Sequence, residues 1–87
     1  MSTVIAVHDV DDVAHWLSSK KRAEFFAAHG MTVKTFVDRG GKNRVGVIIE
    51  NVPSVEALTE ALQGADAAAA MKHDGVHPDS IEMFVAS

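Results

Sequence analysis

The order of its apolar segments constrains the fold of this 87-residue chain more than any other feature. Four short runs are β-branched or alternate apolar with polar residues, as strands do, and these are residues 3–8, 31–38, 43–50 and 80–86. Two longer segments, 12–29 and 54–72, carry apolar residues at helical spacing. This order predicts the split βαββαβ plan, an α+β fold with a four-stranded antiparallel sheet of spatial order 4-1-3-2 and helices on one face.

Glycines and polar residues predict where these segments end or break. Gly30 and Gly75 stand where a helix stops in the left-handed conformation. The polar run 18–21 interrupts the first helical pattern and Gly64 interrupts the second, so each helix is expected to be kinked or split. The paired glycines at 40–41 suit a hairpin turn between the second and third strands.

Composition excludes several classes of protein. A chain of this length is expected to form one domain over residues 1–87, burying only roughly 60 to 65% of its unfolded surface. It has no cysteine, which removes disulfides, thiolate nucleophiles and cysteine-type zinc sites. A formal net charge of -4 with interspersed signs gives no basis for nucleic-acid binding. No run is long and apolar enough to span a membrane, so we expect a soluble, cytoplasmic protein.

Both faces of the predicted sheet carry apolar residues. The odd-numbered set is expected to lie under the helices: Ile5, Val7, Val33, Val37, Val45, Val47, Ile49, Ile81, Met83 and Val85. The even-numbered face also carries an apolar set: Val4, Ala6, Phe36, Ile48 and Phe84. A patch of this size marks an interaction surface. We therefore predict a homodimer with its sheets face to face, in which ~500 Å² of apolar burial per copy contributes on the order of 12 kcal/mol before association costs. The alternative is a monomer with scattered surface apolar residues.

Local motifs add to this topology. They are Trp16 in the first helix, 43–47 (Asn-Arg-Val-Gly-Val) and 50–52 (Glu-Asn-Val) around the third strand, and 70–76 (Ala-Met-Lys-His-Asp-Gly-Val) near the end. Along its whole length the chain resembles the small dimeric α/β-barrel, ferredoxin-like proteins related to antibiotic-biosynthesis monooxygenases and polyketide cyclases. The resemblance implies a cofactor-independent monooxygenase or cyclase that acts on a small aromatic or polyketide-like substrate.

The same superfamily includes haem-degrading enzymes with a histidine on the second helix, which His73 resembles. The first-strand asparagine and the tryptophan ahead of that histidine have no counterpart in this chain. Related sequences also often carry a histidine midway along the first helix, where this chain has Arg22. We therefore assign no metal ligands and no cofactor.

The predicted topology gathers ionisable side chains at one end of the sheet. Four of the five histidines belong there, and they are His8, His15, His73 and His77. Five aspartates join them: Asp9, Asp11, Asp12, Asp74 and Asp79. Such a group suits either a divalent metal or general acid–base catalysis. The spacings are not diagnostic, and the alternative is that the aspartates cap the first helix and the histidines are loop residues.

From these residues we select a candidate site. His8 is the predicted acid–base residue, with His73 and His77 secondary; by parity His8 lies near the dimer interface. Trp16, Phe25 and Met71 are predicted to line an apolar substrate pocket, although residues of these types are more often simply part of the core. The competing functions are a non-enzymatic small-molecule-binding or assembly module and, more weakly, a metal or haem binder.

Overall fold

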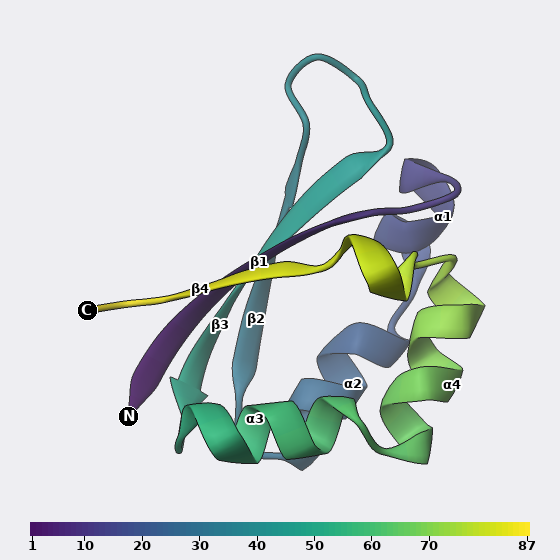
Figure 1. Cartoon of the computed structure of the whole chain (residues 1–87). Coiled ribbons are helices and arrows are strands. Elements are labelled where there is room, and N and C mark those ends of the chain that lie inside the picture. Colours follow the sequence, from purple (N-terminus) through teal and green to yellow (C-terminus); the bar gives the residue numbers. More distant parts are fainter.

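The predicted order of strands and helices is confirmed. The computed structural model describes residues 1–87. Its elements are β1 (Ser2–Asp9), α1 (Val13–Ser18), α2 (Lys21–Ala28), β2 (Thr32–Val37), β3 (Arg44–Val52), α3 (Val55–Leu62), α4 (Ala65–Asp74), the 3₁₀ turn η1 (Pro78–Ser80) and β4 (Glu82–Val85). The strands form one antiparallel sheet in the order β2-β3-β1-β4, which is the predicted order counted from the other edge (Figure 1). The fold is α+β and ferredoxin-like.

Both predicted helices are split where the sequence interrupts them. Asp12 caps α1 by accepting a hydrogen bond from the backbone N–H of His15, and Ser54 caps α3 in the same way for Ala57. Gly64 separates α3 from α4. Gly75 ends α4 with a φ of 72°, in the left-handed region that favours glycine.

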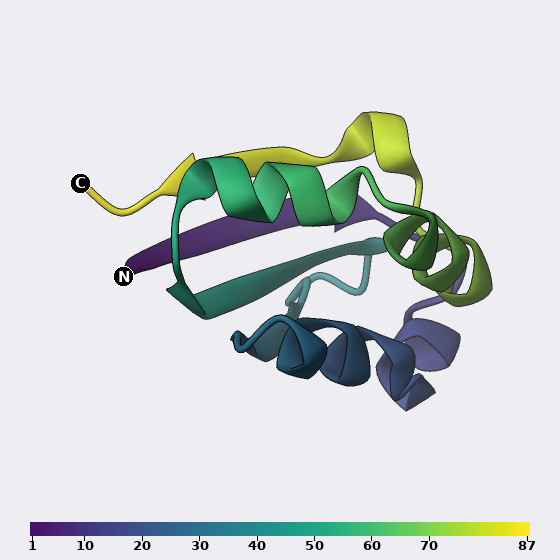
Figure 2. The same ribbon diagram turned by 90° about the horizontal axis from the view of Figure 1, so that it is seen from below.

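The helices cover one face of the sheet. In Figure 2, α2 and α3 run alongside the strands, and α4 lies across one end of both helices. α4 packs against α2 and α3, and α2 also packs against β2. No helix is long and apolar enough to cross a membrane. The opposite face of the sheet has no helix over it.

The register between β1 and β3 corrects the predicted faces of β1. Ala6 pairs with Val47 and His8 pairs with Val45, so even-numbered residues of β1 share a face with odd-numbered residues of β3. Val4 and Ala6 are therefore buried under the helices, where Ile5 and Val7 were expected. Ile5 and Val7 point to the uncovered face instead. The predicted position of His8 near a dimer interface is wrong for the same reason, because His8 points to the helical side.

On the other strands the register agrees with the predicted faces, although Val37 and Val85 are about half exposed. Val45, Val47 and Ile49 are buried under the helices. Phe84 lies opposite Ile5, and Ile48 lies between Ile5 and Lys34, so these side chains share the uncovered face. We call this surface the outer face, and its apolar members are Ile5, Val7, Phe36, Ile48 and Phe84.

Candidate functional site

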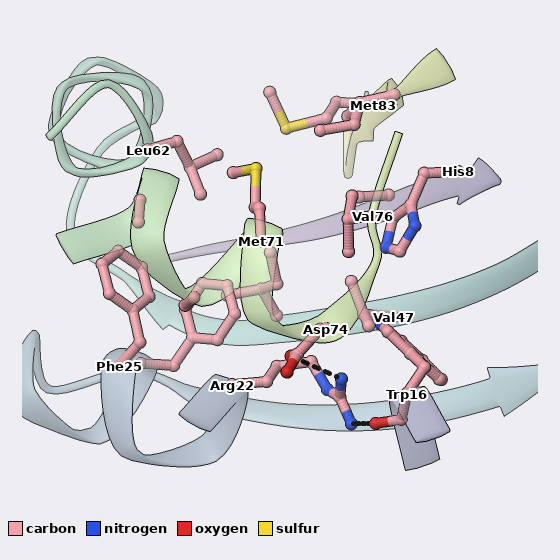
Figure 3. A pocket seen from close by; sticks show the side chains of 16 residues that line it. His8, Trp16, Arg22, Phe25, Val47, Leu62, Met71, Asp74, Val76 and Met83 are labelled. Carbon is pink, nitrogen blue, oxygen red and sulfur yellow. Dashed lines mark hydrogen bonds and ion pairs between the residues drawn. The ribbon is translucent and has the colours of Figure 1, made fainter. Parts of the chain in front are cut away.

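A pocket lies between the helices and the covered face of the sheet (Figure 3). Its cavity volume is about 80 Å³, and 13 of its 16 lining residues are hydrophobic. Trp16, Phe25 and Met71 are among its lining residues, and their contact with a substrate stays a prediction. Its three remaining lining residues are His8, Arg22 and Asp74, so a mostly apolar cavity contains one small polar group.

His8 contributes the imidazole of this group. Its position on the buried face of β1 leaves the residue 7% exposed, and Nδ1 has no hydrogen-bond partner. The ring meets Trp16 edge-on, with centroids 5.8 Å apart. Burial lowers the pKa of His8 from its ordinary 6.5 by more than the backbone and charge of Asp9 raise it, and the positive charges of Arg22 and Arg44 add to the lowering. His8 is therefore a neutral, buried imidazole with a free ring nitrogen.

Arg22 is the cation of the pocket. Its side chain is 12% exposed, and its guanidinium carbon lies 3.9 Å from the centroid of the Trp16 ring, in a cation–π contact. Nη2 donates a hydrogen bond to the carbonyl oxygen of Trp16 at 3.1 Å. Burial lowers the pKa of Arg22, while the carboxylate of Asp74 opposes that shift. An arginine keeps its charge under such conditions.

Asp74 links the pocket to the histidines outside it. Its Oδ2 lies 3.5 Å from Nη1 of Arg22, and its Oδ1 lies 2.9 Å from Nδ1 of His73. Asp74 is only 3% exposed because it ends α4 beneath the turn at Gly75. The carboxylate therefore lies between a buried cation and a half-exposed imidazole.

The other predicted site residues lie at the same end of the sheet but outside the pocket. Nε2 of His15 is 2.7 Å from the carbonyl oxygen of His73, and the two rings are 5.5 Å apart. His77 pairs with Asp11 at 2.5 Å, and this contact raises the pKa of His77. Catalytic roles for His73 and His77 stay predictions. No three His, Asp or Glu side chains come together as a metal-binding group.

Sequence reasoning did not select Arg22 or Asp74 for the pocket. Arg22 stands in a polar, lysine-rich segment that reads as a solvated face, and Asp74 was expected only as one of five clustered acids. The one signal was the resemblance described above, which implies a site residue midway along the first helix, where this chain has Arg22. The burial of both residues depends on how α2 and α4 pack, which the sequence pattern does not give.

Comparisons with known proteins agree with this architecture. No protein-family model matches the sequence, and no curated protein matches it. Among solved structures, the crystal structure of an antibiotic biosynthesis monooxygenase superposes with a TM-score of 0.63 at 16% identity, covering 100% of this chain and 97% of that chain. The chain has the fold of an antibiotic biosynthesis monooxygenase.

Proposed function

We propose that this protein is a cofactor-independent monooxygenase or cyclase for a small, planar, aromatic or polyketide-like molecule, and that His8 removes a proton from that molecule. One observation carries the proposal: a buried imidazole with an unpartnered Nδ1 lies at the polar end of an otherwise apolar pocket. An apolar pocket with a few convergent polar groups is the usual form of a small-molecule site.

Both reactions begin with the same step. Removing a proton from a phenol, or from a carbon next to a carbonyl, gives an anion that attacks either O₂ or a second carbonyl of the same molecule. In the oxygenation, a CH₂ group and O₂ become C=O and H₂O, so the substrate itself supplies the electrons. The lowered pKa of His8 keeps its imidazole neutral near pH 7, which a general base requires.

The size of the cavity sets a condition on binding. A cavity of about 80 Å³ is smaller than the roughly 150 Å³ cavity that holds benzene in another protein. Met71 and Met83 both line the pocket, and Met83 is 40% exposed. Methionine side chains are flexible and adaptable. An aromatic ring therefore enters by displacing these two side chains.

The experiment measures oxygen consumption and product formation with a panel of anthrones and aromatic diketones. We expect His8→Gln to reduce turnover by at least about 100-fold, the low end for loss of a general base, with an unchanged circular dichroism spectrum. His29→Gln is the matched control, because it replaces a histidine that does not line the pocket. Full turnover by the His8→Gln protein would overturn the role of His8. Binding without turnover in the native protein would favour the non-enzymatic alternative.

We also propose that two copies of the chain pack through their outer faces. Three large side chains on that face are about half exposed: Ile5 at 45%, Phe36 at 49% and Phe84 at 58%. Covering ~500 Å² of such surface per copy contributes on the order of 12 kcal/mol, against an association cost of about 4–15 kcal/mol. Sedimentation as a dimer at micromolar concentration is the expected result, and a stable monomer would contradict it.

A further inference from the structure

We infer that the pocket selects ligands that carry an acidic oxygen, and that Arg22 holds this oxygen as an anion beside His8. This inference rests on the proposed function, since both use the same pocket, and it names the chemical class of the substrate. The class is an apolar, planar body with one ionisable oxygen, either a carboxylic acid or an acidic phenol or enol.

The first support is an unused hydrogen-bond donor. Nη1 of Arg22 is buried and has no hydrogen-bond partner, although its charge lies 3.5 Å from Oδ2 of Asp74. The closer contact of Asp74 is made by its other oxygen, 2.9 Å from His73. Asp74 therefore balances the charge of Arg22 without accepting a hydrogen bond from Nη1. Buried donors of this kind are normally satisfied, and a guanidinium binds planar anionic oxygens best.

The second support is the fixed position of the guanidinium. Arg22 stacks on the ring of Trp16 and donates to the Trp16 carbonyl, so the same residue holds it at two points. His8 meets the same indole from another side. Trp16 thus brings the free nitrogen of His8 and the free donor of Arg22 to one end of the pocket. Such preorganised donors stabilise a negative charge well because they do not reorient when it forms.

The rest of the pocket defines the remainder of the ligand. Phe25 and Leu62 lie at the opposite end from His8 and Trp16, and Met71 lies between them (Figure 3). These walls offer no hydrogen bonds. A ligand that fits both ends therefore has its charged or ionisable oxygen at one end and an apolar ring at the other.

The charges around the pocket predict that binding of an anionic ligand is accompanied by protonation of His8. Two charged side chains, Arg22 and Asp74, line the pocket with His8, while Arg44 on the outer face pairs with both Asp9 and Glu82. The two charges in the pocket sum to zero while His8 is neutral. A carboxylate added to the pocket leaves one uncompensated negative charge, unless His8 takes up a proton from solvent. Binding of a carboxylate is therefore expected to be coupled to uptake of one proton from solvent, and binding of a neutral amide is not. A bound phenol or enol instead gives its own proton to His8, which is the step in the proposed function.

The experiment compares benzoate with benzamide, which have nearly the same shape but differ in charge, by quenching of Trp16, the one tryptophan of the chain. We expect the native protein to bind benzoate at least about tenfold more tightly than benzamide near pH 6.5. Calorimetry in buffers of different ionisation enthalpy measures the proton uptake. A third probe, 4-nitrophenol, separates the two sources of acidic oxygen, because its phenolate is yellow and its neutral form is not.

Variants test whether Arg22 carries the preference. Arg22→Gln is expected to bind benzoate and benzamide equally. Because that variant leaves Asp74 unpaired, Arg22→Gln combined with Asp74→Asn removes both buried charges and gives a second measurement. Lys21→Gln is the matched control, since it removes the same charge from an exposed neighbour on α2 and is expected to keep the preference.

The outcomes separate this inference from the proposed function. Equal affinity of the native protein for benzoate and benzamide, or a preference that survives in the double variant, would overturn the assignment of Arg22 and leave the role of His8 standing. Failure of all three probes to bind would overturn the pocket itself, and the proposed function with it. A loss of turnover in His8→Gln with the benzoate preference intact supports both.

Discussion

Two polar side chains, His8 and Asp74, are buried as deeply as the apolar core around them. A buried polar group is tolerated when its partners satisfy it, and an isolated buried charge is expensive. Asp74 meets this condition through Arg22 and His73, whereas Nδ1 of His8 does not meet it. The pocket therefore retains two polar atoms without a hydrogen-bond partner, Nδ1 of His8 and Nη1 of Arg22, which is the feature expected of residues kept for a ligand.

Removing the carboxylate of Asp74 tests how much the buried ion pair contributes to stability. Asp74→Ala leaves the Arg22 guanidinium buried without a counter-charge, so we expect the free energy of unfolding to fall by about 3 kcal/mol or more. Urea denaturation measures the change. Replacing both partners by apolar residues, Arg22→Met with Asp74→Leu, is expected to restore most of the loss. Glu60→Ala on the exposed side of α3 is the control. Equal stabilities of Asp74→Ala and Glu60→Ala would show that the pair contributes nothing.

The contributions of His8 and His77 to stability are expected to change with pH in opposite directions. The contact with Asp11 raises the pKa of His77 above 6.5 in the folded protein, so its contribution is complete below that pH and is lost as pH rises through the raised value. Burial lowers the pKa of His8, so its contribution is complete above 6.5 and is lost as pH falls through the lowered value.

Melting temperatures of two variants test the direction of each pH dependence. His77→Gln is expected to lower the melting temperature more at about pH 5.5 than at about pH 8.5. His8→Gln is expected to reduce the destabilisation that acid causes in the native protein, because the glutamine does not take up a proton. The same pH dependence in both variants would contradict these assignments.

At the scale of elements, the sequence predicted most of the fold because its signals are local. The polar run 18–21, Gly64 and Gly75 break or end helices by their own backbone chemistry, and each does so in the structure. The prediction of which face of β1 is buried was wrong, because the residues of this strand do not alternate: Val4, Ile5, Ala6 and Val7 are all apolar. A strand without alternation carries no information about which side is buried, and its register with β3 decides. Because of this register, His8 lies in the pocket and not on the outer face, where the sequence had placed it.

Gly75 and Gly30 form a matched pair for testing the helix ends. Both are left-handed, with φ values of 72° and 75°. A Cβ at Gly75 would meet Cβ and Oδ2 of Asp11 at 3.2 Å, whereas a Cβ at Gly30 meets nothing within 4 Å. Gly30→Ala is therefore expected to cost only the conformational penalty, about 1 kcal/mol.

Gly75→Ala is expected to cost measurably more, because it adds the contact with Asp11 to the same penalty. That contact also displaces the carboxylate that His77 binds, so the His77 titration followed by NMR should move towards its ordinary pKa. Chemical denaturation of both variants measures the difference. Equal losses of stability in the two alanine variants would show that the turn after α4 shifts to accommodate the added Cβ without strain.

At the scale of the molecule, the chain has one well-filled core on the helical side of the sheet and a second apolar surface on the other side. A chain of this length buries only about 60 to 65% of its unfolded surface by itself. Arg44 crosses the outer face and pairs with Asp9 on β1 and Glu82 on β4, and these contacts compensate its charge beside the apolar residues. An apolar surface on which the arginine is already paired is suited to covering by a second copy.

Phe84→Lys is the substitution that tests this pairing. Phe84 is 58% exposed, so the lysine replaces it without disturbing the monomer core, but in the dimer two copies of the new charge would be buried near apolar side chains. We expect the dimer dissociation constant to rise by at least about 100-fold in analytical ultracentrifugation. Leu17→Lys is the matched control, because Leu17 is 47% exposed on α1 and lies away from the outer face. Since the pocket is formed within one chain, monomeric Phe84→Lys should still bind benzoate. Dimers of unchanged affinity in Phe84→Lys would mean that the outer face is not the contact between copies.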